Sequence, residues 1–346
     1  MTTRSQLSAF VFFLALCACG GGNQGSGGGA TNPSEEGILA DEPSSEPEVT
    51  TAEIKPFPLV SVPMVYADNE EAQTEYVMEH YWDPFFAGHG ATGNDMILGV
   101  SDEEIEQALA NYISLLQNQK ASATPDNPAA LTKAQKSIKT LFSKMESRPG
   151  AAYSRMAELV TKYLYDPNSP LRDEDLYLPF AEAAEKSSCT SEDMRVAYQT
   201  EAKACRTNAF GQKVPDIKYS DARGRKGNLY GVKADYTMLF FSNPGCTACK
   251  EIVNEIVANG YPERLISAGK LAIVNIYIDE EVNKWREYLP NYPSSWINGY
   301  DYTFQLRGSG TYDIRAIPSL YLLDSQKRVL MKDAPTERVL SYLNRI

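Results

Sequence analysis

The sequence Cys246-Thr247-Ala248-Cys249 lies where a strand pattern changes into a helix pattern, and no other feature constrains the chain more. The β-forming run 236–241 ends in a Pro-Gly break, and the following residues 250–258 have helical spacing of apolar positions. We therefore expect Cys246 at a helix N-terminus, where unpaired N–H groups and the helix dipole favour negative charge. If the pKa of its thiol falls from about 8.5 to about 7, the thiolate is favoured by about 2 kcal/mol. Cys249, one helical turn further on, is predicted to be the thiol that closes on Cys246.

The same two cysteines can also be explained as a structural disulfide or as half of a zinc site. A zinc site usually needs about four ligands, supplied by a second cysteine pair or by spaced histidines. The chain has only two histidines, His80 and His89, and its other cysteines are not arranged as a second such pair. We therefore favour redox chemistry, with no metal and no bound cofactor.

A proline at the start of an apolar strand forms a second motif. Proline in a strand pattern belongs at the first residue or on an edge, and the bond before it can be cis at modest cost. The segment 314–319, Ile-Arg-Ala-Ile-Pro-Ser, resembles the cis-proline loop of thioredoxins, and Cys-Thr-Ala-Cys resembles their active-site turn. This resemblance implies that Ile317 and Pro318 dock the substrate, together with Thr247 and Ala248. An ordinary edge strand is the alternative interpretation of the proline segment.

The elements after residue 208 follow the α/β thioredoxin order, in which strands and helices alternate before a final hairpin and helix. The sequence predicts strands at 216–219, 228–230, 235–242, 271–278 and 328–332, a strand after Pro318, and helices at 250–258, 280–289 and from Pro335. The lead-in 211–216 and the additional front hairpin resemble the TlpA/ResA-like branch, which consists of exported, membrane-tethered oxidoreductases.

Three positions depart from the thioredoxin pattern. Gly245 stands where many thioredoxins carry Trp before the first cysteine. Phe240 replaces the acid of the cytosolic proteins, and Ile252 replaces the acid that ResA-like proteins carry after the second cysteine. The residues therefore leave open how Cys249 is deprotonated and what the redox potential is.

Residues 56–207 are predicted to form a mostly α-helical, bundle-like domain. The helical spacing predicts helices at 69–82, 101–117, 128–145, 151–165, 176–185 and 191–205. The acidic runs 102–104 and 173–175 stand where helix-capping acids belong. The aromatic segments 79–83, 162–167 and 296–301 resemble a group of envelope lipoproteins that join a helical domain of unknown function to a TlpA-like domain. Our hypothesis is that the helical domain recognises protein partners or shields the redox face.

The first residues are predicted to be a lipoprotein signal peptide. The apolar run 7–16 is too short to span a bilayer and is typical of a signal-peptide core. The residues before Cys19 resemble bacterial lipoprotein signals, which implies lipidation of Cys19; a plain secretory signal is the alternative. Residues 19–55 are glycine-rich and then acidic, and they are predicted to be a disordered tether with a reach of about 30–35 Å. The predicted division is then 1–18, 19–55, 56–207 and 208–346.

The sequence thus predicts an envelope thiol–disulfide oxidoreductase that is anchored by lipid and faces the periplasm of a Gram-negative bacterium. It would reduce disulfide-bearing exported proteins, and a membrane electron donor would reset it; its membrane and oligomeric state stay open. A thiol peroxidase is one alternative, although Pro244, Thr247 and Cys249 miss the peroxiredoxin spacing. A non-enzymatic, partner-binding lipoprotein with a structural CxxC is the other. The excess of 45 acidic over 33 basic residues argues against nucleic-acid binding.

Cys189 and Cys205 are predicted to be unpaired thiols. If 190–205 is one straight helix, the two α-carbons are about 24 Å apart, which is well beyond the span of a disulfide. A break in the helix would allow the bond.

Overall fold

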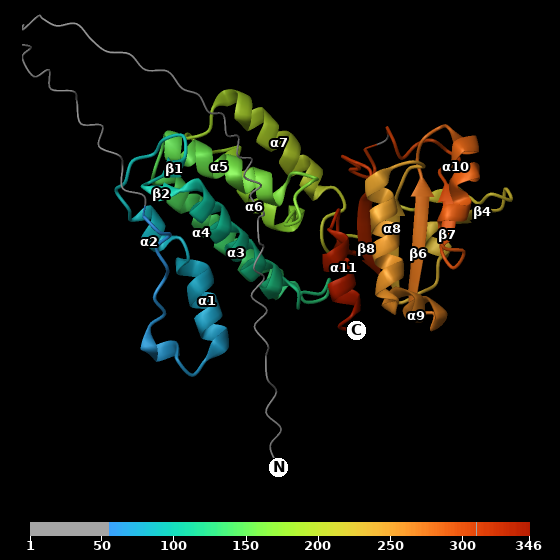
Figure 1. Cartoon of the computed structure of the whole chain (residues 1–346), viewed down its shortest axis with the longest axis horizontal. Coiled ribbons are helices and arrows are strands. Elements are labelled where there is room, and N and C mark those ends of the chain that lie inside the picture. The colour runs from blue at the N-terminus through green and yellow to red at the C-terminus, as the bar shows by residue number, and fades with distance from the viewer. Residues whose placement is uncertain (1–54, 309) are drawn as a thin grey trace, which may run out of the picture. The chain divides into compact units, whose positions relative to one another are not determined.

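The computed structural model describes residues 55–308 and 310–346 (Figure 1). The predicted signal peptide, the predicted lipidation residue Cys19 and nearly all of the predicted tether lie outside the described residues. Within the described part, no helix has both the length and the apolar character that a membrane crossing requires.

The region before residue 208 is helical, as the sequence predicts. After the short 3-10 helix η1 (Met64–Tyr66), the helices are α1 (Glu70–His80), α2 (Asp83–Phe86), α3 (Asp102–Lys120), α4 (Ala129–Glu146), α5 (Ala151–Leu164), α6 (Glu174–Ala184) and α7 (Glu192–Arg206). A two-stranded hairpin, β1 (Met96–Ile97) and β2 (Val100–Ser101), precedes α3. The first predicted helix, 69–82, corresponds to α1, which ends two residues earlier, and the short helix α2 follows beyond the predicted range.

Local sequence explains where two of these helices begin. The Ser101 hydroxyl accepts a hydrogen bond from the Glu104 amide, and the Asp173 carboxylate accepts one from the Leu176 amide. Both side chains satisfy an amide that the first turn leaves without a helical partner. The apolar faces of α3 to α7 meet in one core, in which Tyr112, Tyr177 and Phe180 are completely buried.

The region after residue 208 contains a mixed sheet with the strand order β4-β3-β7-β6-β5-β8-β9. Its strands are β3 (Lys218–Ser220), β4 (Lys226–Asn228), β5 (Tyr236–Phe241), β6 (Leu271–Tyr277), β7 (Ile297–Tyr300), β8 (Ser319–Asp324) and β9 (Val329–Met331). β5 lies in the interior of the sheet, parallel to β6 and antiparallel to β8. The helices are α8 (Thr247–Asn259), α9 (Tyr261–Ser267), α10 (Val282–Tyr288) and α11 (Thr336–Leu343), with 3-10 turns η2 (Leu229–Gly231) and η3 (Leu289–Asn291).

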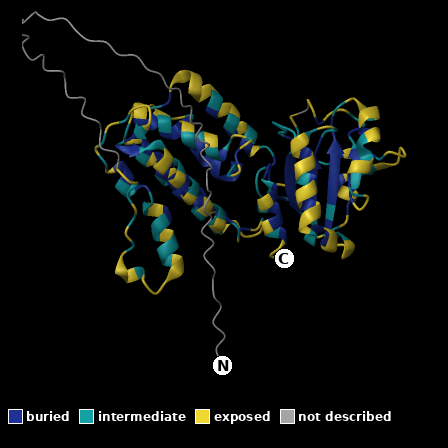
Figure 2. Cartoon of the chain, viewed as in Figure 1, coloured by how far each residue is buried: buried dark blue, intermediate teal, exposed yellow. Residues whose placement is uncertain are grey.

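The two faces of the sheet have separate cores because successive strand residues point to opposite sides. Met238 and Phe240 contribute to the core on which α8, α9 and α11 pack, whereas Leu239 and Phe241 belong to the core of the other face. Figure 2 shows these inner strands almost wholly dark blue, with the exposed residues on the outer sides of the helices. The thioredoxin fold and the preceding helical region are therefore both present, as predicted.

Some sequence expectations differ from the structure. The expected strand 228–230 ends at Asn228, and the next three residues form η2. The short elements α9 and β7 were not expected. α9 follows Gly260, whose positive φ of 68° ends α8 and lets the chain turn into a second helix.

The prediction of two unpaired thiols is confirmed. Cys189 and Cys205 are both free, the first partly exposed and the second buried. Cys189 lies before the start of α7 and Cys205 lies in its last turn, so the helix separates them. Burial raises the pKa of the Cys205 thiol far above its ordinary value, which keeps it protonated.

Candidate active site

Cys246 occupies the N-cap of α8. Its backbone is extended, and its sulfur accepts a hydrogen bond from the Cys249 amide at 3.1 Å. Gly245 directly before it has a φ of 75°, a conformation that glycine adopts without strain, and this residue turns the chain from the strand exit into the helix. Cys246 is partly exposed, so the sulfur at the start of α8 is both accessible and close to helix amides.

The two cysteines are joined by a disulfide, with their α-carbons 5.2 Å apart. Cys249 is only 2% exposed and belongs to the core that also contains Val253 and Ile256 of the same helix. Of the two sulfurs, therefore, Cys246 is the one that an incoming protein can reach.

The predicted docking residues lie beside this disulfide. The Ile317–Pro318 peptide bond is cis. Phe241 at the end of β5 pairs with Ser319 at the start of β8, so this register sets Pro318 next to the point where the chain leaves β5 for Cys246. Cys246 and Ile317 pack against the same core cluster. Thr247 and Ala248 are exposed on the first turn of α8. The sheet and α8 thus gather the six predicted catalytic and docking residues at one end of β5.

A buried polar network, which the sequence analysis did not predict, lies at the same end of β5. The Ser242 hydroxyl is 2.6 Å from Asn275 Oδ1 and 2.9 Å from the Tyr292 hydroxyl, and Asn275 Nδ2 donates to Asn298 Oδ1 at 3.0 Å. Burial raises the pKa of Tyr292. These four groups are uncharged, and Phe240, which stands in the place of an acid, is completely buried. The available signal was a polar residue, Asn275, in the middle of an apolar strand.

A second polar connection ties two loops together at this end of the sheet. Asn243, three residues before Cys246, donates from Nδ2 to Asp279 Oδ2 at 2.7 Å. Asp279 also pairs with Arg307 at 2.8 Å. The Asp279 carboxylate, just after β6, therefore connects the approach to the CxxC with the long loop that leads to Pro318.

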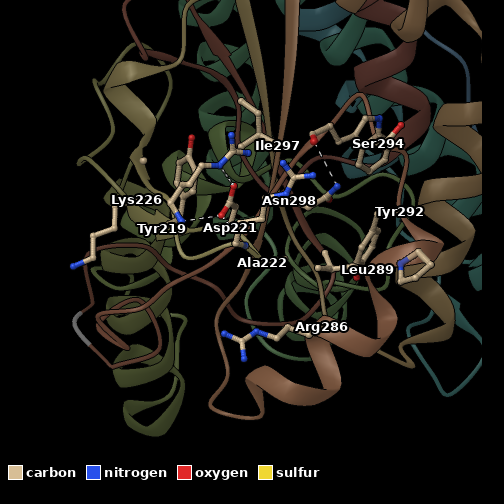
Figure 3. Close-up of a pocket in the computed structure, with 15 residues that line it drawn as sticks. Tyr219, Asp221, Ala222, Lys226, Arg286, Leu289, Tyr292, Ser294, Ile297 and Asn298 are labelled. Carbon is tan, nitrogen blue, oxygen red and sulfur yellow. Dashed lines mark hydrogen bonds and ion pairs between the residues drawn. The ribbon is translucent and has the colours of Figure 1, made fainter.

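Figure 3 shows a pocket of about 930 Å³ in the sheet region. The β3–β4 hairpin and the segment from Arg286 to Asn298 line it, and Tyr292 links it to Ser242 of the polar network. Neither cysteine of the CxxC nor Pro318 is among its lining residues. The chemistry predicted from the cysteines thus belongs to the exposed surface around Cys246 and not to this pocket.

Comparison with known proteins finds matches for the helical region and for the sheet region. The family described as a domain of unknown function, DUF5106, matches residues 37–208, which include the helical region. Among curated proteins, none matches the chain.

The chain is similar over most of its length to a thioredoxin-like protein from Bacteroides caccae. The two are 35% identical, and the match covers 84% of this chain and 99% of that protein with a TM-score of 0.69. A C-terminal domain from Bacteroides fragilis is 40% identical over 40% of this chain and 99% of its own length, with a TM-score of 0.39. A thioredoxin domain of a thiol-disulfide oxidoreductase from Bacteroides vulgatus is 18% identical over 40% and 96% of the two chains, with a TM-score of 0.36. From the first of these matches, the chain belongs to the family of thioredoxin-like proteins.

Proposed function

We propose that this chain is a thiol–disulfide oxidoreductase that reduces disulfides of other proteins through Cys246 and Cys249. The observation that carries the proposal is the pairing of an accessible sulfur at the N-cap of α8 with a buried sulfur one turn away. Helix amides favour the thiolate of Cys246, which is the reactive form in disulfide exchange. The cis Ile317–Pro318 loop next to it offers a surface for the substrate backbone.

The reaction transfers two electrons to the substrate. The Cys246 thiolate attacks one sulfur of the substrate disulfide, that bond breaks, and the leaving sulfur takes a proton from water. Cys249 then loses its proton and attacks Sγ of Cys246, which releases the second substrate thiolate. The products are a substrate dithiol and the Cys246–Cys249 disulfide, the state that the structure contains.

We further propose the setting that the sequence predicts, a TlpA/ResA-like lipoprotein of the cell envelope held by a lipid on Cys19. Its partners are then disulfide-bearing exported proteins, and a membrane electron donor returns the cysteines to the dithiol form. The support is the signal-like sequence before Cys19 and the glycine-rich stretch after it. Mass spectrometry of the membrane-extracted chain and of Cys19→Ala tests this, because only the former should carry acyl chains.

Reduction of insulin in the presence of dithiothreitol tests the activity. We expect the native chain to accelerate insulin precipitation and Cys246→Ser to lose the acceleration. Equal rates for the two proteins would show that the disulfide is only a structural link. The redox potential of the Cys246–Cys249 couple shows whether the chain reduces or oxidises its substrates. A value of about −270 mV indicates a reductant, and a value of about −120 mV indicates an oxidant.

A further inference from the structure

The docking loop is attached to the helical region through Arg315, which lies two residues before Ile317. Arg315 Nη2 is 2.8 Å from Glu174 Oε1 at the start of α6. Its Nη1 donates to the carbonyl of Tyr165 at 2.6 Å, and its guanidinium lies 3.9 Å from the centre of the Tyr165 ring. The Arg315 side chain is only 15% exposed, so water screens these contacts little.

The groups that hold Arg315 are themselves fixed. Glu174 also pairs with Lys332 at 2.6 Å, and Lys332 donates to the carbonyl of Ala204 in the last turn of α7. The Tyr165 ring stacks on Tyr177 with ring centres 4.7 Å apart. Glu174 and Lys332 are almost completely buried. Further contacts therefore hold both groups of the helical region that bind Arg315, the Glu174 carboxylate and the Tyr165 ring, in place.

Charges on the C-terminal side complete the surroundings of Arg315. Its Nη2 is 3.2 Å from Asp333 Oδ2, and its Nε is 3.7 Å from Asp313 Oδ2. Arg172 from the helical region donates to the carbonyl of Asp333 at 2.7 Å. Arg315 thus joins the two regions within a network in which acids and bases alternate.

The loop needs such an external support because it has no regular secondary structure of its own. Between the end of β7 at Tyr300 and the start of β8 at Ser319, the described residues 301–308 and 310–318 form neither helix nor strand. Other fixed points lie earlier in the loop, where Arg307 pairs with Asp279 and the Tyr312 hydroxyl donates to the carbonyl of Pro215. Arg315 is the fixed point nearest to Pro318 among these. A displacement of about 1 Å in a group that orients substrate can cost about 100-fold in rate.

We propose that Arg315, Glu174 and Tyr165 are positioning residues for the disulfide exchange. They hold the Ile317–Pro318 loop in the place from which a docked protein disulfide meets Cys246. The helical region then contributes to the redox site by positioning the docking loop, because two of the three residues, Glu174 and Tyr165, belong to it. This inference depends on the proposed thiol–disulfide oxidoreductase function.

The test compares two substrates in the full chain with Glu174→Gln and Arg315→Lys. Insulin must lay its backbone along the docking loop, whereas the small disulfide 5,5′-dithiobis(2-nitrobenzoate) reaches Cys246 without it. For each variant we expect a fall of about tenfold in kcat/KM for insulin, expressed mainly in KM, because the loop is less well placed. The rate with the small disulfide should stay within about twofold of the native rate, since Cys246 and α8 are untouched.

Glu182→Gln is the matched control. Glu182 is also in α6 and also pairs with an arginine, Arg206, but it is partly exposed and this pair does not contact the loop. It should leave both substrates unaffected. The effect of the double variant Glu174→Gln/Arg315→Lys should be smaller than the product of the two single effects, because the contact between Arg315 and Glu174 can be lost only once.

Three results would overturn the inference. One is an unchanged KM for insulin in both single variants, another is an equal loss with both substrates, and the third is a multiplicative effect in the double variant. If Glu174→Gln does not fold by circular dichroism, Arg315→Lys and Tyr165→Leu, which removes only the ring contact, decide the question. An inactive native chain would instead refute the proposed function itself, so the two failures are distinguishable.

Discussion

Cys246 and Cys249 differ in exposure although they lie one helical turn apart. Cys246 caps α8 at the surface, and Cys249 is in the core beneath it. The difference fixes the order of events in the proposed exchange, because an external disulfide reaches only the first sulfur. The second sulfur can react only with a partner already bound to Cys246.

We therefore predict that Cys249→Ser traps the substrate. Without the second thiol, the mixed disulfide on Cys246 cannot be resolved within the chain, so a covalent complex should accumulate. Non-reducing electrophoresis after incubation with a disulfide-bonded protein should show the complex, and dithiothreitol should dissolve it. Cys205→Ser is the control, because this buried thiol lies outside the site and should trap nothing. A complex that forms equally with Cys246→Ser would contradict the assigned order.

At the scale of secondary-structure elements, Gly260 joins α8 to α9. It has a φ of 68°, and a Cβ placed there would meet only the end of the Arg264 side chain at 3.9 Å. An alanine at this position is strained by its backbone and not by crowding. We expect Gly260→Ala to lower the free energy of unfolding by about 1 kcal/mol.

Gly93→Ala is the matched control for Gly260→Ala. A Cβ at Gly93 has open space around it, and Gly93 is not among the glycines with positive φ. This substitution should be neutral or slightly stabilising, since alanine restricts the unfolded chain. Urea unfolding of both variants measures the difference, and equal stability for the two would contradict the conformational origin of the effect.

The sequence predicts best those elements that have a local signal. Ser101 marks the start of α3, and the apolar run 271–278, interrupted only by Asn275, identifies β6. β7 has four residues, and α9 has seven and follows a glycine, so each contains only about two periods of its pattern, which is too short a run for recognition.

The candidate site also contains residues that a local signal in the sequence predicts and residues that no local signal predicts. Cys246, Cys249 and Pro318 could be predicted because motif and element junction coincide within a few residues. Glu174 could not, since the run 173–175 has the composition of a helix start and its partner Arg315 is 141 residues away. Asp173 does cap α6, as expected, but Glu174 and Asp175 are also buried and paired with bases. Nothing local in the sequence indicates such pairing.

At the scale of the whole molecule, the helical region and the sheet region are joined by buried charges. Asp173 is 4% exposed, with Lys120 at 2.5 Å and Arg338 of α11 at 2.9 Å. Burial alone would raise the pKa of Asp173, but the attraction of Lys120 and Arg338 outweighs it, and the pKa lies below its ordinary value. Lys120 has a second carboxylate, Asp175, at 2.8 Å, whereas Arg338 pairs with Asp173 from a partly exposed position.

We predict that Asp173→Asn lowers the free energy of unfolding by about 3 kcal/mol at neutral pH, because it takes from the buried Lys120 one of its two carboxylates and from the partly exposed Arg338 its ion-pair partner. Asparagine can still cap α6, so the variant removes only the charge. A group whose folded-state pKa is depressed stabilises the fold above its unfolded pKa, and this stability is lost as the pH falls towards the folded value. The difference between native chain and variant should therefore shrink below about pH 4.

Asp126→Asn provides the control for Asp173→Asn. Asp126 also joins the two regions, through Arg328 at 2.7 Å, but its side chain is 78% exposed. Exposed ion pairs contribute little, so this variant should be indistinguishable from the native chain in chemical unfolding at every pH. A loss in Asp173→Asn that does not change with pH would contradict the electrostatic explanation.

The last prediction concerns cooperativity between the two regions. Side chains of the sheet region satisfy backbone carbonyls of the helical region: Lys332 donates to Ala204 and Thr207 at the end of α7, and Arg315 donates to Tyr165. Charged hydrogen bonds of this kind contribute about 1.5–3 kcal/mol each, so unfolding of one region removes several such contributions from the other. We therefore expect the two regions to unfold together.

The three tryptophans allow this to be measured, since Trp82 lies in the helical core and Trp296 in a core of the sheet region. One chain keeps only Trp82 and another keeps only Trp296, with phenylalanine at the other tryptophan positions. In each chain, the urea midpoint from tryptophan fluorescence should coincide with the midpoint that circular dichroism gives for the whole of that chain. When Lys332→Met is added to each of these chains, the fluorescence and circular-dichroism midpoints should separate. The change leaves the buried Glu174 with Arg315 as its partner and removes the donor to the carbonyls at the end of α7. Separate midpoints in the presence of Lys332 would show that each region folds independently, and the buried charges would then act on the docking loop without coupling the two cores.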